Sequence, residues 1–177
     1  IVAALRAGTS LPVEFHAMVE EPRRIFDRFS AHDAEFFSIH YEASRNLHRD
    51  VVTLRKLGFR PGVVLNPQTP LESVEYVLDE LDRITILTTQ PGFDDQRMAP
   101  GTLEKIRALR AWRDRAGSSL ELAVDGGFEL TAVPELASAG VDCLVLGPGP
   151  LLTASASLQV AVSRVREILS GSIQGGD

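Results

Sequence analysis

The feature of this sequence that most constrains its fold is a regular alternation of short apolar runs, rich in β-branched residues, with longer stretches of helical periodicity. The short runs predict strands at Val13–Val19, Phe36–Tyr41, Gly62–Leu65, Ile84–Thr89, Leu120–Val124 and Cys143–Leu146. The periodic stretches predict helices at Ile1–Ala7, Pro22–Phe29, Leu47–Leu57, Leu71–Leu81, Thr102–Arg113, Leu130–Ala139 and Ser155–Leu169. This alternation is typical of right-handed βαβ crossovers, so we expect an α/β protein with a parallel sheet.

Proline and glycine mark the same boundaries. Pro22 and Pro70 fall in or near the first turn of expected helices, where the missing backbone amide costs little. Gly58, Gly117 and Gly140 follow expected helices, and glycine is the residue that most easily adopts the left-handed conformation that ends a helix. The positions of proline and glycine therefore agree with the helix boundaries that the periodicity predicts.

The composition excludes several classes of protein. The 177 residues include one cysteine, Cys143, so no disulfide can form within the chain. The net charge is -6 and Lys and Arg form no run, which argues against a nucleic-acid surface, because phosphates need clustered positive charge. The longest uninterrupted apolar stretches have about five residues, far fewer than the roughly 20 of a membrane span, so we expect a cytoplasmic protein.

The alternation alone leaves two architectures open, a doubly wound sheet and an eight-stranded barrel. The expected strand ends favour the barrel, because its active site gathers polar groups from the carboxyl ends of many strands. These residues are His16, His40 with Glu42, Asn66, Gln90, Asp125 with Gly126 and Gly127, and Gly147. A dinucleotide-binding sheet would instead carry Gly-x-Gly-x-x-Gly after its first strand, and this sequence has no such motif. The sequence predicts six strand and helix pairs, two short of a complete barrel.

Taken one at a time, these residues have ordinary structural explanations. Aspartate followed by two glycines is a common turn sequence, and a histidine on an apolar strand more often completes a core than binds a metal. Glu14 and Glu42 share the face of the histidines by strand periodicity, and either can complete a hydrogen-bond network. Only the ordered set favours a functional interpretation, which we give to His16 and Asp125 and not to His40, Glu14 or Glu42.

Five segments of the chain resemble the ribulose-phosphate 3-epimerases, in the same order. They are Glu14–Met18 with Glu21 and Pro22, similar to the third strand of that family; Ile39–Ala43, the fourth; Leu65–Pro70, the fifth; Gln90–Phe93, after the sixth; and Val124–Gly127, the end of the seventh. The resemblance runs from about Leu11 to the final helix. Each motif alone is unspecific, but five in the right order are specific.

The resemblance implies an α/β fold, a TIM (β/α)₈-type barrel of the ribulose-phosphate-binding kind. Residues 1–177 would supply six of its βα units in a single domain that lacks the first strand, first helix and second strand. The implied reaction interconverts ribulose 5-phosphate and xylulose 5-phosphate at carbon 3, with one divalent metal ion, zinc, iron or manganese. His16 and Asp125 match two of four family metal ligands, and Asp125 matches one of two proton-transferring acids. We therefore expect the 177 residues alone to be inactive.

The resemblance also implies residues that contact the substrate. These are Met18, Gly92, Gly126, Gly127 and Gly147, with His40 and Asn66 as further candidates. Two departures from the family put the phosphate site in question. Asp94 and Asp95 would repel a phosphate if they face it, and Pro148 removes a backbone donor, because proline has no N–H.

Two alternatives to this function stay open. One is a barrel that has lost epimerase activity and serves as a binding protein. The other is an epimerase for a different ketose, such as a hexulose phosphate. For the epimerase we expect a small sugar phosphate as partner, with no nucleic acid and no membrane, and the family resemblance implies a homo-oligomer.

Overall fold

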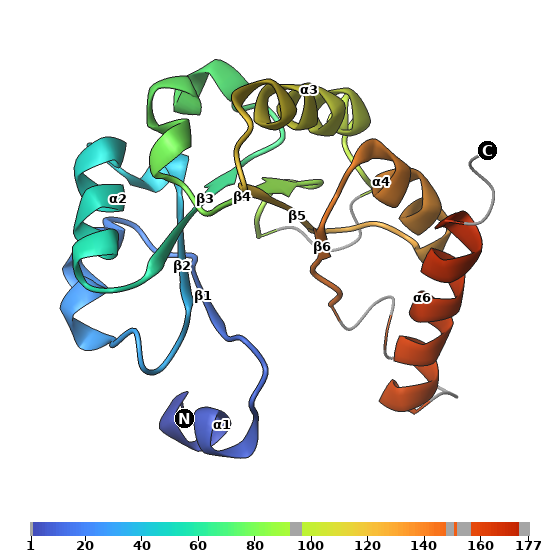
Figure 1. The fold of residues 1–177 in the computed structure, drawn as a ribbon, viewed down its shortest axis with the longest axis horizontal. Helices are drawn as coiled ribbons and strands as arrows, with labels where there is room; N and C mark the ends of the chain where they lie inside the picture. The colour runs from blue at the N-terminus through green and yellow to red at the C-terminus, as the bar shows by residue number, and fades with distance from the viewer. Residues whose placement is uncertain (1, 93–96, 148–150, 152–156, 174–177) are drawn as a thin grey trace. The chain divides into compact units, whose positions relative to one another are not determined.

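The computed structural model describes residues 2–92, 97–147, 151 and 157–173. The chain divides into two compact units, Ile1–Thr85 and Ile86–Asp177, and the boundary falls within the fourth strand. The strands are β1 (Glu14–Ala17), β2 (Phe36–His40), β3 (Arg60–Leu65), β4 (Arg83–Leu87), β5 (Glu121–Asp125) and β6 (Cys143–Leu144) (Figure 1). Hydrogen-bonded neighbours follow the chain order, β1-β2-β3-β4 and β4-β5-β6, and the pairs β1–β2, β2–β3 and β5–β6 are parallel. All six expected strands are confirmed.

The helices alternate with these strands, as the periodicity predicted. The α-helices are α1 (Val2–Gly8), α2 (Leu47–Lys56), α3 (Thr102–Ala116), α4 (Val133–Ala139) and α6 (Leu158–Ile173). The 3₁₀ helices are η1 (Pro22–Arg28), η2 (Tyr41–Ala43), η3 (Leu71–Glu80) and η4 (Leu130–Ala132). No helix in the described part of the chain has the length and apolar character that a membrane span requires.

Two expected helices, Pro22–Phe29 and Leu71–Leu81, take the tighter 3₁₀ form. In η3 the buried residues Leu71, Val74 and Val77 are three apart, and a 3₁₀ helix has three residues per turn, so all three fall on one side. At the start of η1 the Arg24 N–H donates to the carbonyl of Glu21, three residues earlier, at 3.0 Å. Apolar spacing of three residues fits both kinds of helix, which is why the sequence pattern did not distinguish them.

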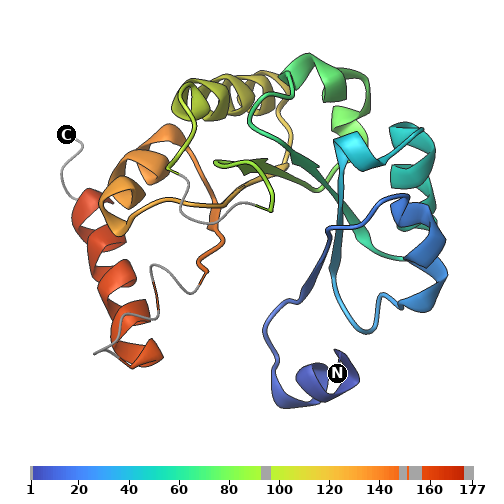
Figure 2. The ribbon, with the colours of Figure 1, turned by 180° about the vertical axis from the view of Figure 1, so that it is seen from behind.

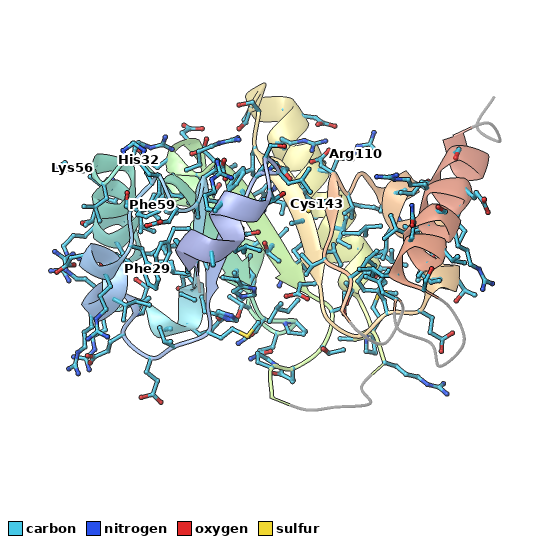
Figure 3. All side chains as sticks on the ribbon, turned by 90° about the horizontal axis from the view of Figure 1, so that it is seen from below. Phe29, His32, Lys56, Phe59, Arg110 and Cys143 are labelled. Carbon is cyan, nitrogen blue, oxygen red and sulfur yellow. The ribbon has the colours of Figure 1, made fainter. Side chains whose placement is uncertain are left out.

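Aromatic rings form the core of the first unit. The register pairs Phe15 with Phe37 and Ala17 with Ile39, which places these four side chains on one face of the sheet. Phe37 is fully buried, and ring centroids 5.3 to 5.8 Å from its own belong to Phe15, Phe26, Phe29 and Phe59. Figure 3 labels Phe29 and Phe59 in this cluster. The face that these phenylalanines occupy leaves the alternate positions on the strands for polar residues.

The other face of the same strands carries a buried polar network. The Ser38 hydroxyl and the Arg83 guanidinium both donate to the carboxylate of Glu14. Gly62 lies opposite Ser38 in the register, and a Cβ at position 62 would lie 2.0 Å from Ser38 Oγ. The absence of a side chain at Gly62 therefore leaves room for Ser38. Glu14 completes a hydrogen-bond network, which is the structural role that we considered for it from the sequence.

The second unit packs its helices in chain order (Figure 2). Helix α4 contacts both α3 and α6. Leu122 of β5, Ile106 of α3 and Leu136 of α4 are fully buried in this unit. Helix α3 ends at Gly117 and α4 at Gly140, both in the left-handed conformation with φ of 61° and 101°. These two glycines end the helices that the sequence predicted them to end.

Candidate active site

Two imidazoles meet at the carboxyl end of the strands in the first unit. His16 lies on β1, and His40 is the last residue of β2. Their Nε2 atoms are 3.0 Å apart, the ring planes differ by 24°, and the centroids are 5.1 Å apart. The centroid separation is about as long as the two ring radii and the N–N distance added together. The two Nε2 atoms therefore point toward each other and share a hydrogen bond. His40 is buried, and His16 is half-buried.

Glu42, in the short helix η2, extends this pair. Its Oε2 lies 3.7 Å from His40 Nδ1. Its Oε1 accepts hydrogen bonds from the backbone N–H of Asn66, at 3.0 Å, and from the hydroxyl of Thr69. Burial raises the pKa of Glu42, but the hydrogen bonds from His40, Thr69 and Asn66 outweigh it and lower the pKa from 4.5 to about 2. Glu42 is therefore ionised at neutral pH.

Thr69 is a residue of this cluster to which the sequence assigned no role. It lies in the turn after β3, where its N–H donates to the carbonyl of Asn66 at 3.1 Å. The signal was present, because Thr69 falls within the segment that resembles the family's fifth strand. Asn66, a candidate on that resemblance, contacts Glu42 through its backbone amide.

Met18, expected to contact substrate, follows β1 and is 63% exposed.

In the second unit, Asp125 is the last residue of β5, and Gly126 and Gly127 follow it. The carbonyl of Asp125 accepts a hydrogen bond of 2.8 Å from the N–H of Thr88, the first residue after β4. The Asp125 residue is half-buried. A carboxylate thus ends this strand at the edge where the sequence placed it.

Gly126 is closely packed against the end of β4. Its φ is 117°, and a Cβ there would lie 2.6 Å from Thr88 Oγ1 and 3.0 Å from Thr89 Oγ1. Thr88 is fully buried, and its Oγ1 has no hydrogen-bond partner among the described residues. Only glycine combines this backbone conformation with this lack of space.

Replacing Gly126 by alanine is expected to lower the free energy of unfolding by about 1–3 kcal/mol, because it adds a left-handed backbone penalty to a contact with Thr88. Urea denaturation measures the change. Gly147→Ala is the matched control, since Gly147 also follows a strand but its Cβ would meet no described residue within 4 Å. We expect the control to change stability by less than about 0.5 kcal/mol. Equal effects of the two substitutions would contradict the close packing at Gly126.

The other glycines of the expected phosphate site also lie in the second unit. The N–H of Gly127 donates to Thr89 Oγ1 over 3.4 Å. Gly92 has a φ of 82°, and Gly147 follows β6. Asp94, Asp95 and Pro148, which depart from the family pattern, lie outside the described residues, as does Phe93, the last residue of the segment that resembles the family after its sixth strand.

The donor types at these strand ends fit a divalent transition metal, which takes neutral imidazole nitrogens and carboxylate oxygens. His16 supplies an imidazole in the first unit, and Asp125 supplies a carboxylate in the second. Within residues 2–92, 97–147, 151 and 157–173, no group of three or more His, Cys, Asp or Glu side chains is arranged to hold a metal ion. The described residues therefore supply candidate ligands rather than a complete site.

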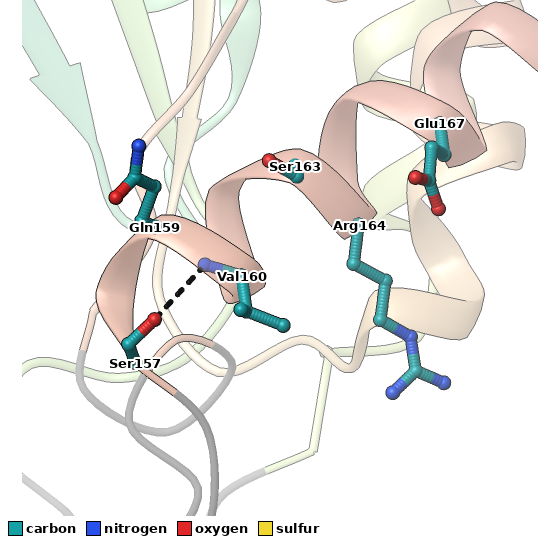
Figure 4. A pocket seen from close by; sticks show the side chains of 6 residues that line it. All are labelled: Ser157, Gln159, Val160, Ser163, Arg164 and Glu167. Atoms are coloured by element: carbon teal, nitrogen blue, oxygen red, sulfur yellow. Dashed lines mark hydrogen bonds between the residues drawn. The ribbon is translucent and has the colours of Figure 1, made fainter.

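A surface pocket of about 420 Å³ lies along helix α6 (Figure 4). Its lining residues are Ser157, Gln159, Val160, Ser163, Arg164 and Glu167. At the start of the helix, Ser157 Oγ accepts a hydrogen bond of 3.4 Å from the N–H of Val160. All six residues belong to one helix and the residue before it, and none comes from a strand end, so we assign no part of the candidate active site to this pocket.

Comparison with known proteins finds one family along most of the chain. A sequence profile of the ribulose-phosphate 3 epimerase family matches residues 1–149. The chain is 38% identical over 148 residues to a ribulose-phosphate 3-epimerase of Bacillus subtilis, a match that covers 83% of this chain and 68% of the relative. It is 38% identical over 140 residues to the ribulose-phosphate 3-epimerase of Escherichia coli, covering 79% of this chain and 62% of the relative. The matched part is thus about two thirds of the length of these relatives.

Solved structures agree on the fold. A 3-keto-L-gulonate-6-phosphate decarboxylase from Vibrio cholerae superposes with a TM-score of 0.72 at 14% identity, covering 96% of this chain and 78% of the other. At this identity the likeness shows the fold alone, which is the TIM-barrel type that the strand ends favoured. The profile and the relatives identify the chain more closely: it belongs to the ribulose-phosphate 3-epimerase family, a family of isomerases.

Proposed function

We propose that the protein containing this chain interconverts ribulose 5-phosphate and xylulose 5-phosphate. The observation that carries the proposal is Asp125, an acid that ends strand β5 in a chain of this family. Barrels of this type place their catalytic groups at that end of the strands. The proposal includes a single barrel domain over residues 1–177, a cytoplasmic location, a homo-oligomeric state and a role in pentose phosphate metabolism.

The chemistry requires proton transfer on both faces of carbon 3. A base removes the proton from one face, and an acid returns a proton to the other, through an enediolate. In the proposal, the Asp125 carboxylate takes or gives the proton on one face. A divalent metal ion, zinc, iron or manganese, would stabilise the negative charge of the enediolate, with His16 and Asp125 among its ligands.

Substrate binding is proposed to use the loops that follow the strands. Backbone N–H groups of glycine-rich loops can hold a phosphate, because no side chain blocks their approach. We assign this role to Gly92, Gly126, Gly127 and Gly147. Met18, which is exposed beside the end of β1, would cover the sugar with an apolar side chain.

The test is turnover by the whole protein that carries this chain, purified and loaded in turn with zinc, iron and manganese. We expect D-ribulose 5-phosphate to give D-xylulose 5-phosphate, with one deuterium incorporated at carbon 3 in D₂O. A panel of hexulose phosphates separates this substrate from other ketoses. No epimerisation of any sugar with any of the three metals, together with no metal affinity, would contradict the proposal and favour a binding protein.

A further inference from the structure

Two loops of the first unit meet at one buried carboxylate, that of Asp50. The loop that follows β1 (residues 18–21) leads into η1, and the loop that follows β2 (residues 41–46) leads into α2. We propose that Asp50 is a positioning residue, which ties these two segments together and so fixes Met18 of the first relative to Glu42 of the second. The consequence for turnover rests on the proposed function, whereas the tie itself does not.

Asp50 is held in place by helix α2. It lies in the first turn of the helix, and its N–H donates to the carbonyl of Asn46, four residues earlier, at 3.1 Å. The side chain of Asn46 caps the same helix by accepting a hydrogen bond of 3.2 Å from the N–H of Arg49. A carboxylate in the first turn also interacts favourably with the positive end of the helix dipole. The carboxylate of Asp50 therefore has a fixed position from which it can hold other segments.

Each oxygen of the Asp50 carboxylate binds a donor from a different segment. Oδ1 accepts a hydrogen bond of 3.2 Å from Nη1 of Arg23, in the first turn of η1. Oδ2 accepts a hydrogen bond of 2.8 Å from the hydroxyl of Ser44, in the loop after β2. The Asp50 side chain is only 4% exposed, so water does not readily replace either donor. Movement of either segment would leave an oxygen of a buried carboxylate without its partner, which is costly.

The backbone of Glu21 shows that the first loop needs such a tie. Its φ is 51°, and Glu21 is the one non-glycine residue with a positive φ in the part of the chain that the structure describes. This left-handed conformation is unfavourable for a residue with a side chain and persists where surrounding contacts determine it. Glu21 Oε1 pairs with Nη2 of Arg45 at 2.7 Å, but the Arg45 side chain is 84% exposed. Exposed pairs contribute little, so we expect the buried Asp50 to supply most of the tie.

The consequence concerns substrate binding. Met18 is 63% exposed, so its position depends on the backbone of its loop more than on packing of its side chain. His16, by contrast, lies on β1, where the register pairs it with Ser38 of β2. Loosening the loop should therefore weaken contact with the sugar more than it disturbs the strand that carries His16. A loss of binding that is common to the ground state and the transition state raises KM and leaves kcat unchanged.

The tie is measured by amide hydrogen exchange in the whole protein, followed residue by residue by NMR. In the first segment, the N–H of Arg24 donates to the carbonyl of Glu21 at 3.0 Å. In the second, the N–H of Ser44 donates to the carbonyl of Tyr41 at 3.1 Å. In Asp50→Ala both amides should exchange at least about 10-fold faster than in the wild type, because local opening no longer breaks a bond to the carboxylate. Amides within β3 should be affected much less.

Asp50→Asn tests whether the hydrogen bonds can restore the tie without the charge. Its amide oxygen can accept from Arg23, and its NH₂ group can donate to the hydroxyl oxygen of Ser44, so exchange should return most of the way to the wild-type rates. Asp27→Ala, at an exposed position of η1, is the matched control. It also removes a carboxylate from the first unit, and it should change the exchange of neither amide.

Steady-state kinetics of the whole protein test the consequence for the sugar. Asp50→Ala should raise KM for D-ribulose 5-phosphate by about 3 to 30-fold, with kcat within about three-fold of the wild type. Asp50→Asn should bring KM back toward the wild-type value. A lower kcat with an unchanged KM would overturn the role of Asp50 in positioning the substrate-binding loop.

The outcomes separate this inference from the proposed function. Wild-type exchange at either amide in folded Asp50→Ala, or an equal increase throughout the first unit, would overturn the tie. Faster exchange in both segments of a protein that epimerises no sugar would support the tie and contradict the proposed function. If Asp50→Ala does not fold, Arg23→Met and Ser44→Ala decide the question. Each should speed exchange in the segment that loses its donor, and wild-type rates in both variants would overturn the tie.

Discussion

Replacing Asp125 by asparagine is expected to reduce epimerisation by about 10²–10⁴-fold and to abolish exchange of the carbon 3 proton with solvent. Asparagine keeps the size of the side chain at the end of β5 but cannot take up a proton at neutral pH, so general acid and base catalysis on one face is lost. The measurement is deuterium incorporation in D₂O, followed by NMR of the sugar. Loss of this exchange is the result that ties Asp125 to the reaction.

The matched control is Asp79→Asn, on the exposed side of η3. It makes the same chemical change at an exposed helical position outside the candidate site and should leave turnover within about two-fold of the wild type. Exchange at the wild-type rate in folded Asp125→Asn would contradict the role of this carboxylate. Loss of activity together with loss of the folded state would instead show a structural role, so each variant is first compared by circular dichroism.

Replacing Phe37 by alanine is expected to lower the free energy of unfolding by about 3–5 kcal/mol, a large part of the roughly 5–15 kcal/mol that stabilises a typical domain. Phe37 is fully buried and lies within 5.8 Å, centroid to centroid, of four other phenylalanine rings. Its removal leaves a cavity that the surrounding rings, held by the strand β1 and the helix η1, can fill only in part. Urea denaturation followed by fluorescence and circular dichroism measures the loss.

Tyr76→Ala provides the control for Phe37→Ala, because Tyr76 is 95% exposed. It removes an aromatic ring of similar size and should change stability by less than about 0.5 kcal/mol. If Phe37→Ala were as mild as this control, the aromatic cluster would not be the main source of stability in the first unit.

The order of strands and helices was predictable because it depends on local patterns that the sequence displays directly. Gly58, Gly117 and Gly140 all have positive φ at helix ends, as their positions indicated. The form of η1 and η3 was not predictable, since apolar residues three apart serve an α-helix and a 3₁₀ helix equally well. Local periodicity identifies the buried side of a helix but not its pitch.

The candidate site was predictable in its residues and not in its connections. Their positions at expected strand ends placed His16 and His40 at one edge of the sheet, and the structure brings their rings into hydrogen-bond contact. One oxygen of Glu42 lies near His40, and the other accepts hydrogen bonds from Asn66 and Thr69. The second set of contacts depends on the turn after β3, because that turn brings residues 24 and 27 positions away in the sequence to the carboxylate of Glu42. Contacts between residues so far apart in the sequence produce no periodic pattern, so they could not be predicted from this sequence alone.

The polar network of Glu14, Ser38 and Arg83 beside Gly62 limits which amino-acid substitutions can be accepted at these four positions during evolution. Replacing Ser38 or Arg83 removes a donor from the Glu14 carboxylate, and replacing Gly62 brings a Cβ to 2.0 Å from Ser38 Oγ. Breaking a buried charged pair by changing one partner is strongly destabilising. We therefore expect substitutions at these four positions to be accepted together rather than one at a time. Among descendants of this sequence, we expect these four sites to covary as a block while the exposed positions around them drift independently.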